Sequence, residues 1–287
     1  MNWRIHHKIE TVSTNLDARA GVHGDVYTAD FQTAGRGRLD HKWQSPPGAN
    51  LMMSVVLGVG ARGRMGAEGG MGVKETLPEE IATLPLVIGL AVVRAIRSLL
   101  PQGGGERSPR TPPAELLPLL KWPNDVLVGG RKVSGILCER HGDFVIAGIG
   151  VNVKQCVFSP EIAKRATSLV ELMGSVPTSE GSVPQGCGER APRTPPAVGS
   201  VPISVEGVRD VVLEEIAELY EIWREGGFAA VYPEIQAVDC LRGQTLAVKQ
   251  TDDDAEPVRG VCGGIAPDGS LLVGSVPIYA GEAHVMA

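Results

Sequence analysis

A short basic stretch, Gly35-Arg36-Gly37-Arg38, has residue types and spacing that could hold an anion. Glycine permits positive φ and close approach to the backbone, while arginine carries a fixed positive charge on a planar fork of N–H donors. Alternating the two makes a loop suited to phosphate or carboxylate oxygens. A solvated hairpin with two exposed arginines is the alternative, and the loop alone does not decide between them.

Three further stretches place polar side chains beside apolar runs. Residues Lys121 to Val128, KWPNDVLV, carry a lysine, an amide and a carboxylate around a proline that keeps the residue before it extended. In Arg131 to Leu137, RKVSGIL, Lys132 stands three residues before a glycine. Gly148 to Val153, GIGVNV, holds Asn152 on an apolar strand, where a bound ligand could supply the partner that a buried amide needs. Taken singly, each stretch is better explained by a structural role: a turn, a solvated lysine and a satisfied core amide.

Polar residues also begin a predicted helix near the N-terminus. Residues Ile9 to Gly21 predict a short strand that turns into a helix, with Ser13 or Thr14 as N-cap and Asp17 in the first turn. Capping alone would account for the two hydroxyls. If the helix start faces a cavity, these groups become donors and acceptors for a polar ligand.

Apolar periodicity predicts the elements that position these side chains. Strands are predicted at 26–31 and 51–59 around the basic loop and at 119–128, 132–140 and 143–154, and amphipathic helices at 84–100 and 205–224. Arg94 and Arg97 fall on the side of the first helix away from its apolar face. Short links at Gly129-Gly130 and His141-Gly142 predict consecutive hairpins, and therefore an antiparallel or mixed sheet.

The C-terminal part follows another pattern. From about Leu241, short alternating runs separated by Asp-rich and Pro-Asp-Gly turns predict a small closed β-barrel. Its Gly-Ser-Val-Pro at Gly274 is expected to be an extended loop. Two other segments, about 101–118 and 174–202, are predicted to be low-complexity insertions, and they share the near-identical decapeptides GERSPRTPPA and GERAPRTPPA.

Composition narrows the function classes. With 27 Lys and Arg against 33 Asp and Glu, the net charge is -6, so a general nucleic-acid-binding surface is not indicated. The N-terminus lacks the features of a signal peptide, and the longest apolar run is too short to span a bilayer, which predicts a cytoplasmic protein without a membrane partner. The five cysteines lack a C-x-x-C pair and predict scattered reduced thiols: Cys138, Cys156, Cys187, Cys240 and Cys262.

Together, these motifs have the order and spacing of one family: the chain resembles the biotin protein ligases, which attach biotin to carboxylase carrier domains. The resemblance runs from S-T-N at Ser13 through G-R-G-R, K-W-P-N-D-V, R-K-V-S-G-I-L-C-E and G-I-G-V-N-V to T-S-L at Thr167 and D-G-S-L-L at Asp268. It implies an α/β (α+β) mixed-sheet catalytic domain at 1–237, akin to class II aminoacyl-tRNA synthetases and lipoate ligases. A small SH3-like barrel is implied at 238–287.

The resemblance also implies which partners to expect. Relatives that repress transcription carry an N-terminal winged helix-turn-helix, whereas the motifs here begin at Ser13, so a monofunctional form without a nucleic-acid partner is expected. Relatives often pair through an exposed sheet edge, which would allow a homodimer.

The implied reaction has two steps. Biotin and MgATP give biotinyl-5'-AMP and pyrophosphate, and a lysine of a biotin carboxyl carrier protein then attacks the activated carbonyl. Biotin's carboxylate and the α-phosphate are both negative, so cations must be in place before they meet. The resemblance assigns that catalytic work to Lys132, Arg36 and Arg38.

The same resemblance assigns the ligand contacts. Those of biotin are Ser13, Thr14, Asn15, Gln32, Arg36, Gly37, Arg38 and Lys132. Those of ATP and the adenylate are Gly35, Trp43, Lys121, Asn124, Asp125 and Asn152, with Asp125 also expected to bind Mg²⁺. Residues 35–43 are expected to order over the intermediate and exclude water. Leu39-Asp40-His41 departs from the Gly and Arg that many relatives keep there, which bears on retention of the intermediate.

Two alternatives belong to other classes. A lipoate or octanoate ligase or transferase would use the same fold, but the double-arginine and triple-glycine pattern of lipoate ligases is absent, and a transferase needs a cysteine in the lysine motif. Cys138 lies three residues beyond Gly135 inside a predicted strand. A non-catalytic biotin-binding module is disfavoured by the retained lysine and arginines.

Overall fold

The computed structural model describes residues 1–39, 41–59, 78–100, 113–174, 203–250 and 256–286. Most of both low-complexity segments predicted from sequence lies outside these residues. Within the described residues, no helix combines the length and the apolar character needed to cross a membrane.

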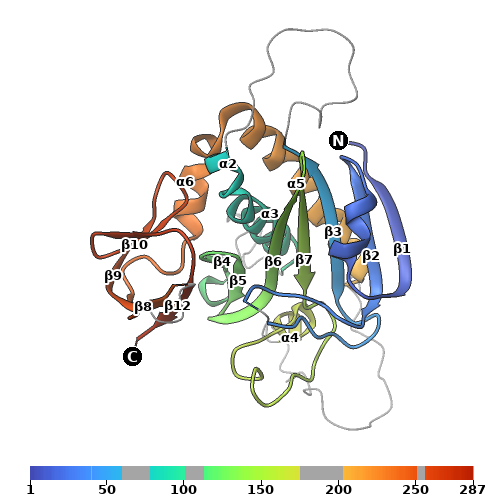
Figure 1. Cartoon of the computed structure of the whole chain (residues 1–287). Coiled ribbons are helices and arrows are strands. Elements are labelled where there is room, and N and C mark those ends of the chain that lie inside the picture. The colour runs from blue at the N-terminus through green and yellow to red at the C-terminus, as the bar shows by residue number, and fades with distance from the viewer. Residues whose placement is uncertain (40, 60–77, 101–112, 175–202, 251–255, 287) are drawn as a thin grey trace, which may run out of the picture.

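A mixed seven-stranded sheet forms the main body (Figure 1), with the strand order β1-β2-β3-β7-β6-β5-β4. The strands β1 and β2 are parallel, and every other neighbouring pair is antiparallel. The strands are β1 (Arg4–Thr11), β2 (Asp25–Gln32), β3 (Leu51–Gly58), β4 (Pro118–Lys121), β5 (Asp125–Val128), β6 (Arg131–His141) and β7 (Phe144–Val151). The predicted mixed-sheet fold is thus present.

The three longer described helices cover one face of this sheet (Figure 1). The described helices are α1 (Thr14–Asp17), α2 (Pro78–Ile81), α3 (Leu84–Leu99), α4 (Leu169–Gly174), α5 (Val205–Gly226) and α6 (Phe228–Val238), with 3-10 turns at Ala18–Ala20 and Ala114–Leu116. The helix α3 is the central one, because most of its side chains are buried against the sheet and α5. Arg94 lies at its polar edge, where it pairs with Glu215 and Glu218 of α5 and Glu234 of α6 and so ties three helices together.

A second, five-stranded antiparallel sheet follows α6. Its order is β11-β10-β9-β8-β12. The strands are β8 (Thr245–Lys249), β9 (Val258–Ile265), β10 (Leu271–Val273), β11 (Val276–Ile278) and β12 (Glu282–Val285). It lies beside β4 and β5, at the opposite end of the large sheet from β1 (Figure 1). Trp122 Nε1 donates to the Gly269 carbonyl at 3.1 Å, and this contact joins the two sheets.

The single strand predicted at 119–128 is wrong, because the chain reverses there. The strands β4 and β5 form a hairpin with a turn at residues 122–124, and the Trp122-Pro123 peptide is cis. Proline has no N–H to give to a strand ladder, and cis proline is characteristic of one class of tight turn. This turn brings Lys121 and Asp125 opposite each other in register.

Several other predictions need adjustment. The β6–β7 hairpin turns at Gly142-Asp143, one residue later than predicted, because His141 pairs with Phe144. The Gly-Ser-Val-Pro at Gly274 is a tight hairpin and not an extended loop, with Val276 already paired in β11. Gly274 has φ +60°, which suits glycine in such a turn. The helices α2, α4 and α6 and the strand β11 were not predicted.

Candidate functional site

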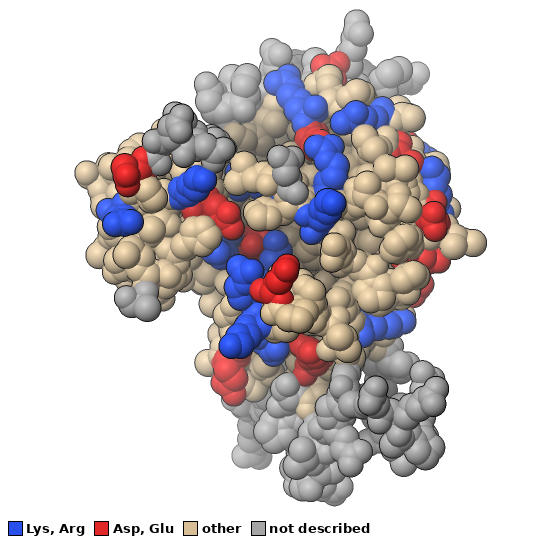
Figure 2. All heavy atoms as spheres, turned by 60° about the horizontal axis from the view of Figure 1, so that its bottom comes forward, with Lys and Arg blue, Asp and Glu red and all other residues tan. Residues whose placement is uncertain are grey.

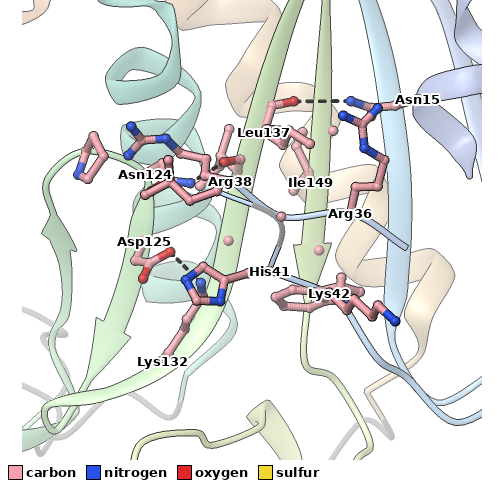
Figure 3. A pocket seen from close by; sticks show the side chains of 18 of the residues that line it. Asn15, Arg36, Arg38, His41, Lys42, Asn124, Asp125, Lys132, Leu137 and Ile149 are labelled. Atoms are coloured by element: carbon pink, nitrogen blue, oxygen red, sulfur yellow. Dashed lines mark hydrogen bonds and ion pairs between the residues drawn. The ribbon is translucent and has the colours of Figure 1, made fainter. Parts of the chain in front are cut away.

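A cavity of about 160 Å³ lies between the sheet, the basic loop and the C-terminal strands. Its lining comes from α1, β2, the loop at 36–43, β3, the β4–β5 turn, β6, β7 and residues 281–283. Figure 3 shows Asn15 and Arg36 on one side of it and Asp125 and Lys132 on the other. In the space-filling view, acidic and basic side chains meet in the hollow between the C-terminal lobe and the main body (Figure 2). The site therefore draws on segments from almost the whole length of the chain.

Two glycines of the G-I-G-V-N-V motif give the cavity its depth. Gly148 and Gly150 lie on β7, two residues apart, and so share one face of the strand. A Cβ at Gly148 would overlap the amide of Asn15, and a Cβ at Gly150 would overlap the indole of Trp43. Because these two positions have no side chain, the Asn15 amide and the Trp43 indole can approach the strand closely.

Hydrogen bonds connect the polar end of the cavity. The backbone N–H of Thr14 donates to Gln32 Oε1 at 2.7 Å, and the Thr14 hydroxyl oxygen lies 3.1 Å from the same oxygen. The Ser54 hydroxyl donates to Asn15 Oδ1 at 2.6 Å, and Asn15 Nδ2 donates to Glu139 Oε2 at 2.7 Å. The predicted residues Thr14, Asn15 and Gln32 are thus brought together.

Ser13 also lines this end of the cavity. It stands at the N-cap of α1, a single helical turn, and its side chain makes no capping hydrogen bond. Capping therefore does not account for its hydroxyl. Ser13 is only 3% exposed, so this hydroxyl lies within the wall of the cavity.

Sequence reasoning missed Ser54 and Glu139. Ser54 is the one polar residue within the buried strand β3 and is fully buried, and a lone polar side chain in an apolar run was the available signal for it. Glu139 stands beside Arg140 and His141 at the end of β6, so the sequence offered no such signal for it. Nothing in sequence alone says that the two residues meet at Asn15.

Three cationic side chains of the cavity are each held by an acceptor of the chain itself. Lys132 Nζ lies 2.5 Å from Asp125 Oδ1, and Arg36 Nη1 lies 3.3 Å from Glu139 Oε1. Arg38 Nη1 donates to the Gly281 carbonyl at 3.3 Å. Burial lowers the pKa of Arg38, while nearby carboxylates oppose that shift, and an arginine stays charged over the whole physiological range. An anion entering the cavity would meet three fixed positive charges.

Trp43 lies close to the lysine. Lys132 Nζ is 5.9 Å from the centroid of the Trp43 ring, within range of a cation–π contact. The Trp43 Nε1 is buried without a hydrogen-bond partner in the described residues. A buried unpaired donor costs free energy, so this indole N–H marks a place where an acceptor would be favourable.

The basic loop folds back on itself and reaches the C-terminal sheet. Arg36 and Lys42 form an antiparallel bridge, and Trp43 N donates to the Gly35 carbonyl at 3.0 Å. His41 Nε2 lies 3.8 Å from a carboxylate oxygen of Glu282. Of the divergent Leu39-Asp40-His41 segment, Asp40 lies outside the described residues. Gly37 lines the cavity together with Arg36 and Arg38. Gly35 instead lines a second hollow, which is formed mainly by the basic loop itself.

The remaining predicted residues divide into two groups. Lys121 and Asn124 line the cavity, and Asn124 Nδ2 donates to the Ile136 carbonyl at 2.5 Å. Asn152 does not line it: its Nδ2 donates to the Thr167 carbonyl at 3.0 Å, and its Oδ1 is 3.5 Å from Asn50 Nδ2. Thr167 and Asn50 therefore supply the hydrogen-bond partners of Asn152 that the sequence analysis expected from a bound ligand.

Cys138, next to the lysine motif, does not line the cavity. Burial raises the pKa of its thiol to about 12. A thiol with such a pKa stays protonated at neutral pH, and the thiolate is the reactive form. Cys138 is therefore unsuited to act as a nucleophile. The four described cysteines, Cys138, Cys156, Cys240 and Cys262, are all free thiols.

Comparison with known proteins gives a consistent assignment. Residues 20–155 match the model of the biotin/lipoate A/B protein ligase family. The structure of biotin protein ligase from Aquifex aeolicus in complex with biotin and ATP matches 99% of this chain and 98% of its own, with a TM-score of 0.70 and 26% identity. Over these residues the chain is similar to the biotin/lipoate protein ligases. The mixed-sheet fold expected from the resemblance is confirmed, and the antiparallel C-terminal sheet agrees with an SH3-like domain.

Two bacterial proteins are among those similar to this chain in sequence. The chain is 36% identical over 174 residues to biotin--[acetyl-CoA-carboxylase] ligase of Mycobacterium tuberculosis, covering 58% of this chain and 55% of that protein. It is 34% identical over 135 residues to the bifunctional ligase/repressor BirA of Escherichia coli, covering 45% of this chain and 33% of that protein. The matched part spans less than two thirds of the length of either relative.

Proposed function

We propose that the protein is an ATP-dependent biotin protein ligase, which activates biotin as biotinyl-5'-AMP and transfers it to a lysine of a biotin carboxyl carrier protein. The observation that carries the proposal is the convergence of hydrogen-bonding side chains and three cations on one cavity. The names of the relatives point the same way, since one is a biotin--[acetyl-CoA-carboxylase] ligase and one family structure holds biotin and ATP.

The polar end suits the ureido ring of biotin. Its N–H and C=O groups need partners when buried, and hydroxyl and amide side chains offer both donors and acceptors. The cationic end then receives the biotin carboxylate. The proposed biotin contacts are Ser13, Thr14, Asn15, Gln32, Arg36, Gly37, Arg38 and Lys132.

The nucleotide is proposed to bind between Trp43 and the β4–β5 turn. The proposed contacts are Gly35, Trp43, Lys121, Asn124 and Asp125. Asn152 is left out because its amide is engaged by Thr167 and Asn50 away from the cavity. We expect Mg²⁺ to arrive with ATP, since it commonly binds nucleotide phosphates together with one or two carboxylates. Asp125 fits such a ligand, and the described residues hold no cluster of three or more metal-binding side chains.

The first step joins two anions. A carboxylate oxygen of biotin attacks the α-phosphorus of ATP, the new P–O bond forms, and pyrophosphate leaves. At about 4 Å and an effective dielectric constant near 20, each pairing of unit charges is on the order of 4 kcal/mol, so Lys132, Arg36 and Arg38 can offset much of the repulsion. For this, Lys132 exchanges its carboxylate partner, Asp125, for substrate oxygens, and Arg36 offers the N–H groups that do not face Glu139.

The second step consumes the mixed anhydride. The carrier lysine amine attacks the acyl carbon, the C–O bond to AMP breaks with its electron pair going to AMP, and the amine loses a proton as the amide forms. Premature attack by water must be prevented meanwhile. The loop at 35–43, which contacts Gly281 and Glu282 across the cavity, is placed to do this.

The proposal includes a division of the chain into a catalytic domain at 1–237 and a small barrel at 238–287. It is supported by the end of α6 at Val238 and by the separate pairing of the strands β8 to β12. A homodimer is also proposed, through the uncovered edge strand β1, in which Ile5 and Ile9 are 43% and 78% exposed. Sedimentation of the purified protein tests this, and a monomer at micromolar concentration would exclude the dimer.

A labelling assay tests the activity. The protein is incubated with MgATP, a biotin carrier domain, and either biotin or lipoate. We expect pyrophosphate release and labelling of the carrier with biotin and neither with lipoate. Labelling by lipoate but not by biotin would favour a lipoate or octanoate ligase, and tight biotin binding without pyrophosphate release would favour a non-catalytic binding module.

A further inference from the structure

Glu139 contacts two different parts of the site with one carboxylate. Its Oε2 accepts from Asn15 Nδ2 at 2.7 Å, and its Oε1 lies 3.3 Å from Arg36 Nη1 and 4.0 Å from Arg19 Nη2. The side chain is 24% exposed, so these contacts are partly shielded from water. Glu139 is not among the lining residues of the cavity, yet Asn15 and Arg36 both are.

The contact with Glu139 fixes the orientation of the Asn15 side-chain amide. An asparagine has an acceptor oxygen and a donor nitrogen of similar size, and the surrounding hydrogen bonds decide their orientation. An ionised carboxylate only accepts hydrogen bonds, so Nδ2 must face Glu139. The Asn15 oxygen then faces the Ser54 hydroxyl, which donates to it at 2.6 Å.

The orientation of Asn15 also determines the direction of the hydrogen bonds between the buried hydroxyl groups beside it. A serine hydroxyl has one proton, so once Ser54 donates to Asn15, its oxygen can only accept from the Thr14 hydroxyl, 2.7 Å away. Ser54 is fully buried, and Asn15 is 5% exposed, so water does not compete freely here. Glu139 is the one charged member of this chain, and its charge therefore sets the direction of every hydrogen bond in it.

We propose that Glu139 is a positioning residue for biotin: it holds the Asn15 amide in one orientation and keeps Arg36 beside the same pocket. This inference rests on the proposed function. A neutral glutamine at 139 would weaken the constraint, because its amide can donate as well as accept. The Leu137 carbonyl, 3.4 Å from Asn15 Nδ2, would then be the remaining acceptor that favours the original orientation of Asn15 (Figure 3). The pocket would present a mixture of donor and acceptor patterns to the ureido ring.

The test compares Glu139→Gln with Glu215→Gln. Glu215 is a matched control, because its side chain is 25% exposed and lies 3.3 Å from an arginine Nη1, that of Arg94, in the helical layer. Biotin and ATP affinities are measured by calorimetry, and adenylation by pyrophosphate release. For E139Q we expect biotin to bind about tenfold more weakly, as for the loss of one charge-assisted hydrogen bond, with ATP affinity and kcat at saturating biotin within about threefold of wild type. For E215Q we expect no change in either affinity.

A double-mutant cycle with Asn15→Ala isolates the route of the effect. If Glu139 acts through the Asn15 amide, E139Q should weaken biotin binding by less than about twofold when Asn15 is already alanine. An equal loss in both backgrounds, or no loss in either, would overturn the inference. So would an equal fall in biotin and ATP affinity, which would indicate general damage.

Folding and the proposed function are controlled separately. Thermal melting shows whether E139Q is folded; if it is not, Glu139→Asp keeps the charge but shortens the reach, and wild-type biotin affinity in E139D would count against the inference. Failure of the wild-type protein to bind biotin would instead reject the proposed function. The two failures are therefore distinguishable.

Discussion

Lys132 and Asp125 form the closest ion pair in the cavity, with 2.5 Å between Nζ and Oδ1. They come from β6 and the start of β5, two strands that pair with a register shift at this point. The Lys132 side chain is 36% exposed and the Asp125 side chain 23%, so the pair lies at the cavity wall and not in the core. Such a pair can open without a large desolvation penalty, which a lysine that must turn to a substrate requires.

Lys132→Ala should therefore lower the rate of adenylation. Losing one charge-assisted contact of about 1.5–3 kcal/mol corresponds to about tenfold or more in rate. The measurement is single-turnover pyrophosphate release with biotin and MgATP. Lys8→Ala is the control, since Lys8 pairs with Asp17 outside the cavity lining. An unchanged rate in the Lys132 variant would remove this residue from its proposed role.

The two glycines of β7 should separate the two substrates. Gly148→Ala places a methyl group against the Asn15 amide and is expected to weaken biotin binding by about tenfold or more, with ATP much less affected. Gly150→Ala places one against the Trp43 indole and should weaken ATP binding more than biotin binding. Calorimetry on both variants provides the comparison, each variant serving as the control for the other. The same loss for both ligands in both variants would contradict this assignment.

Cys138→Ala should leave biotin transfer within about twofold of wild type, because a thiol with a pKa of about 12 is not an effective nucleophile. Native protein at pH 8 should also resist alkylation at Cys138, as read by mass spectrometry after digestion. Loss of transfer in the variant would point to a covalent acyl-enzyme, as in the transferase alternative.

Stability near the junction of the two sheets should depend on pH in a defined direction. Burial raises the pKa of Asp239 above its ordinary value of 3.8, although the amides of Leu241 and Ile265 donate to its carboxylate. The folded state thus holds the proton more tightly than the unfolded state. The contribution to stability is fully present below pH 3.8 and is lost as the pH rises through the folded pKa.

Asp239→Asn is neutral at every pH, so the melting temperature of the variant relative to wild type should rise with pH above about 4. Asp268→Asn is the control of opposite sign. Burial tends to raise the pKa of Asp268, but hydrogen bonds from Ser270 outweigh it and lower the pKa, so ionised Asp268 stabilises the fold. Its variant should lose melting temperature relative to wild type as the pH rises towards about 4, and the difference should then stay constant at higher pH. Parallel pH profiles for the two variants would refute both assignments.

Much of the fold follows from local sequence pattern. The strands at β2 and β3, the helices α3 and α5, and the short C-terminal strands all have the apolar period of the element they form. The errors occur where tertiary context decides. The β4–β5 hairpin was predicted as one strand because its two halves are continuous in apolar character, and α6 was missed although its buried residues pack on α5 and β4.

What the sequence determined by itself was the inventory of the site: a basic glycine loop, a lysine before a glycine, a hydroxyl-rich helix start and a glycine-rich strand. Residue type and local spacing specify these, because charge, hydrogen-bonding capacity and backbone freedom belong to single residues. The tertiary structure decided which of them meet. It placed Asn15 against Gly148, drew Ser54 and Glu139 into the same hydrogen-bond chain, and turned Asn152 away, since such contacts depend on strand register and on segments more than a hundred residues apart.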